Sequence, residues 1–133
     1  MNSVALSFVL FAAVALADTV QHRWNVVHQH CQTSPVTHVA DELFDQLKRG
    51  ENPKLPHNFA LHANCMLVNL NLQDDQGNII PEGVRQAAQN QFSNKAKVDQ
   101  IVHDCSVSKG NREMNAMNLF GCLRKNNVNI GQL

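Results

Sequence analysis

Four cysteines constrain the fold of this chain more than any other feature. They are Cys31, Cys65, Cys105 and Cys122, and they are widely spaced. Structural zinc sites need close pairs of the C-x2-C kind, and the set contains none. If the chain is exported, four cysteines are typical of two disulfides, which can be connected in three ways. The spacing alone does not choose among these connectivities.

The N-terminus indicates export. An apolar run over residues 4–15 leads into Ala15-Leu16-Ala17, which has the small-x-small pattern that signal peptidase recognises. The run is shorter than the roughly 20 apolar residues that a membrane-spanning helix needs. We therefore predict a cleaved signal peptide over residues 1–17, a single domain over residues 18–133 and no membrane insertion.

The charge balance argues against nucleic acid as a partner. Lys plus Arg number 11 and Asp plus Glu number 11, so the formal net charge is zero. A balanced chain lacks the basic surface that binds nucleic acid or anionic lipid. The chain has no Tyr and one Trp, which disfavours a platform for stacking bases.

Apolar residues recur at helical spacing, so we predict an all-α domain of about six short helices. The segment from Leu55 to Leu70 is apolar all round and is expected to form the central helix. Lys48-Arg49-Gly50 is a typical helix end. The expected helix starts are, in chain order, Asp18 or Thr19, Ser34-Pro35, Leu55-Pro56, Pro81, Ser93 and the break at Lys109-Gly110-Asn111.

The cysteine spacing is similar to that of insect odorant-binding proteins, which are secreted chains of this size with the six-helix PBP/GOBP fold. Their common form has six cysteines, with three residues between the second and third and eight between the fifth and sixth. Here Leu61 stands where the second would precede Cys65, and Glu113 stands where the fifth would precede Cys122. These two are partners in the six-cysteine form, so losing both leaves no orphan thiol. The chain therefore resembles the four-cysteine type, over nearly all of residues 18–133.

The resemblance implies disulfides Cys31–Cys65 and Cys105–Cys122 and a helical shell around an apolar cavity. It also implies a secreted carrier that reversibly binds small hydrophobic ligands such as odorants, pheromones or lipid-like molecules, without a cofactor. Apolar and flexible side chains suit such a cavity, although they equally suit a filled core. The expected lining is Leu43, Leu47, Phe59, Met66, Leu70, Val84, Ala88, Phe92, Ile101, Met117 and Phe120.

Histidines are a second candidate feature, because imidazole titrates near pH 6.5 and its charge can weaken ligand binding in acid. We expect most of them to be exposed and passive. The pair His28-x-His30 before Cys31 points to different faces of a helix, so no metal site is expected. The seven histidines are His22, His28, His30, His38, His57, His62 and His103.

The C-terminal residues are a third candidate. Val128, Ile130 and Leu133 alternate loosely with polar residues. In the family resembled, this segment can fold over the mouth of the ligand pocket. A frayed terminus is the alternative.

An enzyme is not expected. His103-Asp104-Cys105 resembles the His-Asp-x-Cys segment of secreted phospholipases A2, but here Cys follows Asp directly and no Gly-rich calcium loop precedes it. Within the resemblance, sensillar lymph, haemolymph and gland secretions all remain open as locations, and a secreted protein-interaction module without a ligand remains open as a function. An olfactory receptor and a second copy of the chain remain open as partners.

Overall fold

The computed structural model describes residues 20–131, so the predicted signal peptide lies outside the described residues. Within this range the chain forms six helices and no strand, with one isolated bridge between Gln73 and Ile79. This confirms the all-α prediction. The helices are an N-terminal helix over residues 20–32, α2 (Asp41–Lys48), α3 (Phe59–Asn69), α4 (Pro81–Gln89), α5 (Lys95–Cys105) and α6 (Arg112–Lys125). None of these helices is long and apolar enough to cross a bilayer.

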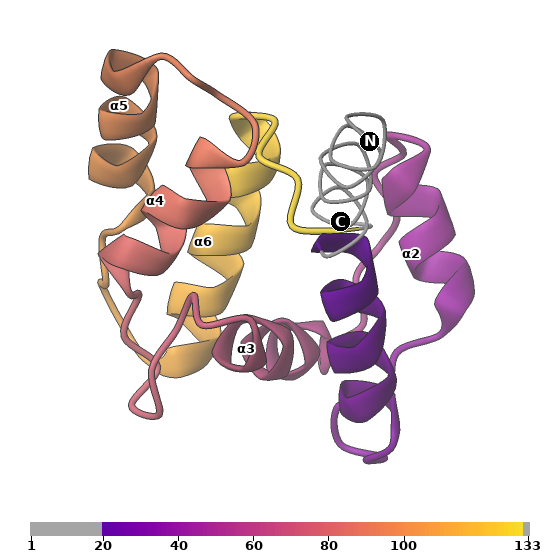
Figure 1. Ribbon diagram of the computed structural model, residues 1–133. Coiled ribbons are helices and arrows are strands. Elements are labelled where there is room, and N and C mark those ends of the chain that lie inside the picture. Colours follow the sequence, from indigo (N-terminus) through magenta and orange to yellow (C-terminus); the bar gives the residue numbers. More distant parts are fainter. Residues whose placement is uncertain (1–19, 132–133) are drawn as a thin grey trace, which may run out of the picture.

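Helix α3 lies between the two halves of the fold (Figure 1). The N-terminal helix and α2 lie on one side of it, and α4, α5 and α6 lie on the other. Helix α3 packs against α6, and α5 packs against both α4 and α6. After α6 the chain returns toward the N-terminal helix, where Gly131 lies against the ring of Trp24.

Two disulfides fix this arrangement, and they have the connectivity that the resemblance implied. Cys31–Cys65 joins the end of the N-terminal helix to α3, and Cys105–Cys122 joins the end of α5 to α6. The first closes a separation of 34 residues and the second a separation of 17. Because the chain entropy removed by a cross-link grows slowly with loop length, the first is expected to stabilise the fold by about 0.6 kcal/mol more than the second.

The predicted start of the second helix at Ser34-Pro35 is wrong, because α2 begins at Asp41. Local side-chain hydrogen bonds hold the preceding residues in turns. The Thr37 hydroxyl donates to the Cys31 carbonyl, and the Gln32 amide bonds both the N–H and the C=O of Val39. Such bonds give the backbone an alternative to helix formation.

Two other predicted starts are shifted. The third helix begins at Phe59 and not at Leu55-Pro56, because the Phe59 N–H closes a turn onto the Pro56 carbonyl. The fifth helix is capped by Asn94 and not by Ser93, since the Asn94 side chain accepts from the Lys97 N–H. The predicted start at Pro81 and the break before α6 are confirmed.

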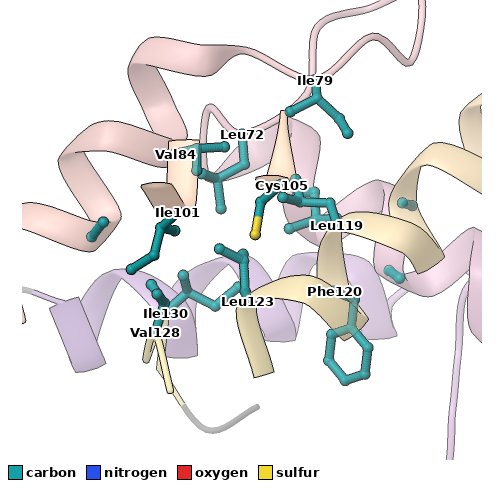
Figure 2. Close-up of a cluster of buried hydrophobic side chains, with 14 of the residues drawn as sticks. Leu72, Ile79, Val84, Ile101, Cys105, Leu119, Phe120, Leu123, Val128 and Ile130 are labelled. Atoms are coloured by element: carbon teal, nitrogen blue, oxygen red, sulfur yellow. The ribbon is translucent and has the colours of Figure 1, made fainter. Parts of the chain in front are cut away.

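The core consists of two clusters. The larger lies mainly between α3, α4, α5 and α6, where Val84, Ile101 and Leu119 are fully buried (Figure 2), and it extends to Phe44 and Leu47 of α2. The smaller contains Trp24, Val27, Cys31 and Met66 and holds the N-terminal helix against α3. Leu70 packs against both clusters. The prediction that α3 is the central helix is therefore confirmed.

Two buried amides hold the loop after α3 against the start of α6. Gln73 donates to the carbonyls of Gly77 and Arg112, and Asn115 donates to the carbonyls of Gly77 and Gly110. The Asn115 carbonyl oxygen also accepts from the N–H groups of Lys109 and Gly110. Because buried polar groups are costly when unpaired, this network fixes where α6 begins.

Gly77 provides a test of this packing. Its φ is +84°, and a Cβ there would lie 2.2 Å from the Arg112 Cβ. We expect Gly77→Ala to lower the free energy of unfolding by about 2 kcal/mol, through the left-handed backbone and the clash. Urea denaturation of the oxidised protein measures it.

Gly121→Ala is the matched control. Gly121 lies within α6 with nothing within 4 Å of a built Cβ. Because Ala is the better helix former, this variant is expected to gain up to about 1 kcal/mol. Equal losses in the two variants would contradict the packing described for Gly77.

Candidate functional site

Two pockets lie on either side of the C-terminal segment of residues 127–131, which we call the tail. The smaller has a volume of about 100 Å³ and is lined by Val20, Arg23, Leu70, Leu72, Gly83, Gln86, Ala87, Asn90, Asn129 and Ile130. The larger has a volume of about 560 Å³ and is lined by Gln21, Leu47, Lys48, Gly50, Arg124, Asn127, Val128, Asn129 and Gly131. Asn129 belongs to both, so the tail forms a shared wall.

The tail is anchored at both of its buried side chains. Val128 and Ile130 are buried in the larger core cluster, beside Leu123 and Ile101 (Figure 2). The Asn129 N–H donates to the side chain of Gln91, just after α4. The tail therefore packs on the core as far as Gly131, and the expectation of a frayed terminus is wrong for residues 127–131. Leu133, the third residue of the predicted pattern, lies outside the described residues.

The two pockets share an electrostatic character. Arg23 lines the smaller, Lys48 and Arg124 line the larger, and no carboxylate among residues 20–131 lines either. The remaining polar lining is provided by backbone and by uncharged side-chain amides such as Asn129. The pockets therefore combine apolar surface with positive charge, although the whole chain is neutral.

Most of the predicted lining residues lie outside these two pockets. Leu70 lines the smaller pocket and Leu47 the larger. Leu43, Phe92 and Met117 are partly buried against the larger core cluster. The remaining six are buried core residues, namely Phe59, Met66, Val84, Ala88, Ile101 and Phe120. Whether these eleven residues contact a ligand stays a prediction.

Sequence patterns missed the polar part of the pocket walls. Helical periodicity selects large apolar residues on buried faces, whereas these pockets are built at helix ends and beside the tail. Arg23 and Asn129 carry no periodic signal. The available clue was the alternation of Val128 and Ile130, which places the intervening Asn129 on the opposite side of the tail.

Comparison with known families identifies the fold. The model of the PBP/GOBP family matches residues 13–126. The chain belongs to this family. No curated protein matches it. The two disulfides are consistent with the four-cysteine form of the family, whose members are secreted proteins that bind small hydrophobic ligands. The family consists of binding proteins and not of enzymes.

Two histidines of this PBP/GOBP chain are buried together. His28 stacks on Trp24 with ring centroids 4.5 Å apart, and His62 meets His28 at 5.3 Å. Phe44 packs edge-on against His28 and lies 4.9 Å from His62. The other histidines within residues 20–131 are exposed, as expected. The cluster connects the N-terminal helix, α2 and α3.

In each of the two buried imidazole rings, one nitrogen has a hydrogen-bond partner. His62 Nδ1 lies 2.6 Å from the Thr37 carbonyl, and His28 Nε2 lies 3.4 Å from Asp41 Oδ1. His62 Nε2 and His28 Nδ1 have no partner among the described residues. No group of three metal-binding side chains is found within residues 20–131.

The pKa of His62 is lowered from 6.5 to about 4, chiefly because burial disfavours the charged ring. The positive charge of His28 and His38 when protonated lowers it further, whereas the Thr37 carbonyl and Asp41 raise it. The folded protein therefore holds His62 neutral under conditions in which the unfolded chain would protonate it.

We expect acid to destabilise the fold through His62. Between about pH 6.5 and pH 4 the unfolded chain binds a proton that the folded chain does not, so the free energy of unfolding falls as pH falls. The loss should reach about 2–3 kcal/mol near pH 4. Urea denaturation across this range measures it.

Substitution separates His62 from the exposed histidines. His62→Gln should flatten the pH dependence, whereas His103→Gln should leave it unchanged, because His103 is 89% exposed. An unchanged slope in His62→Gln would show that other groups cause the acid sensitivity.

Proposed function

We propose that this chain is a secreted carrier that reversibly binds small hydrophobic ligands such as odorants, pheromones or lipid-like molecules. The observation that carries the proposal is the PBP/GOBP match over residues 13–126, together with the two disulfides that match the four-cysteine form. The apolar run at the N-terminus, followed by Ala15-Leu16-Ala17, supports export through a cleaved signal peptide of residues 1–17.

We place the ligand beside the tail. The smaller pocket offers the apolar side chains of Leu70, Leu72, Ala87 and Ile130. Its volume of about 100 Å³ is below the range of roughly 300 Å³ and more that ligand sites usually have. Binding therefore requires side chains or the tail to shift. Burial of hydrocarbon supplies the driving force, at about 25 cal/mol per Å².

The biological setting follows from where the protein is made. Sensillar lymph would make an olfactory receptor the recipient of the ligand, whereas haemolymph or a gland secretion would make the chain a general carrier. The physics of the site is the same in each case. A second copy of the chain is compatible with all three settings.

Displacement of a neutral apolar probe tests the carrier function. The full chain is produced in a secreting eukaryotic host and purified from the medium with both disulfides intact. We expect N-phenyl-1-naphthylamine to bind with micromolar affinity, at one probe per chain, and to be displaced by volatile or lipid-like compounds. Absence of binding by a folded, oxidised protein would reject the carrier function and favour a protein-interaction module.

A matched pair of variants locates the site. Ala87→Phe fills the smaller pocket and should weaken probe binding at least tenfold. Ala96→Phe makes the same change at an exposed position of α5 and should leave binding unchanged. Equal affinity in the two variants would place the ligand away from the tail.

A further inference from the structure

Seven of the eleven Lys and Arg residues form no ion pair among the described residues, and three of these seven line the pockets. Elsewhere in the described residues, Arg49, Arg85, Lys95 and Arg112 each pair with a carboxylate. Within residues 20–131, no carboxylate forms an ion pair with the three cations that line the pockets, Arg23, Lys48 and Arg124. The described part of the pocket walls thus carries an excess of positive charge in a chain of zero net charge.

Arg124 is held in place with part of its guanidinium unused. Its Nη2 donates to the carbonyls of Leu47 and Glu51, at 3.2 and 3.4 Å. Its Nε and Nη1 have no acceptor among the described residues, and the side chain is half-buried. The nearby Glu51 carboxylate is paired with Arg49 and does not line the pocket. A pre-positioned guanidinium with spare donors suits an anionic oxygen.

Helix ends explain part of this pattern but not all of it. Lys48 and Arg124 lie in the last turns of α2 and α6, where cations balance the helix dipole. Arg23 lies far from the C-terminal end of its helix, which continues to residue 32, so the dipole does not account for this cation. A dipole also does not explain why no carboxylate among the described residues lines either pocket. The charge pattern therefore points to a ligand.

We propose that the ligand is an amphipathic anion, with a carboxylate head and a hydrocarbon chain. The inference rests on the proposed carrier function. The head lies in the larger pocket, which Lys48 and Arg124 line beside Leu47 and Val128. The hydrocarbon extends past Asn129 toward the smaller pocket, because that residue lines both.

A pair of ligands that differ in the head tests the proposal. Decanoate and 1-decanol carry chains of the same length, so their difference reports the charge. At pH 7.5 we expect decanoate to displace N-phenyl-1-naphthylamine at about tenfold lower concentration than 1-decanol, with the preference shrinking in high salt. Decyl phosphate distinguishes the head groups. Displacement equal to that of decanoate would extend the site to any anionic head, and weaker displacement would confine it to carboxylates.

Substitutions test whether Lys48 and Arg124 cause the preference for decanoate over 1-decanol. Lys48→Gln combined with Arg124→Gln should bring decanoate and decanol within about twofold of each other, with decanol unaffected. Lys125→Gln removes one positive charge on α6 outside the pocket and should preserve the preference. Arg124→Lys keeps the charge, so a retained preference there shows that charge, and not loss of the Leu47 contact, is responsible.

The outcomes separate this inference from the carrier function. Binding of decanol as strong as that of decanoate would overturn the anionic ligand and leave the carrier intact. A preference for decanoate that survives the double substitution would also overturn it, because the head would then lie elsewhere. Failure of both compounds and of the probe to bind would overturn the carrier function itself.

Discussion

The fold depends on the burial of helix α3, which has little polar surface to present to water. Phe59, Ala63, Met66 and Leu67 form one nearly inaccessible face, and Ala60, Leu61 and Val68 on the other sides of the helix are half-buried. Other elements must therefore cover it on several sides. Helix α6 covers one side through the contact of Phe59 with Phe120, and the N-terminal helix covers another through Met66. The Cys31–Cys65 disulfide makes the second contact permanent.

Much of this arrangement could be predicted from the sequence, because it follows from local chemistry. Pro81 can begin a helix but cannot lie in its interior, and Asn111 caps α6 with its own side chain. The apolar character of residues 59–70 indicated the central helix. The cysteine spacing, by its resemblance to a known family, indicated the two disulfides.

What could not be predicted depends on contacts between distant residues. The delayed start of α2 follows from the Gln32 side chain bonding to Val39, which no periodicity encodes. The pockets are bounded by a tail whose position depends on Gln91 and Trp24, far away in the sequence. Apolar periodicity finds the core, whereas these pockets lie where the core ends.

The buried histidines and the pocket cations belong to one connected part of the molecule. His62 bonds the Thr37 carbonyl in the turn that leads into α2, and Phe44 of α2 packs on the same ring. Helix α2 then ends at Lys48, in the wall of the larger pocket. Burial of His62 disfavours its charged form, so its protonation in acid is expected to destabilise the packing of α2. Helix α2 carries Lys48, one of the two cations of the larger pocket. A carboxylate ligand loses its charge over a neighbouring range of pH, near its ordinary pKa between 4 and 5. Both effects act in the same direction, because each weakens the attraction between head group and pocket as pH falls.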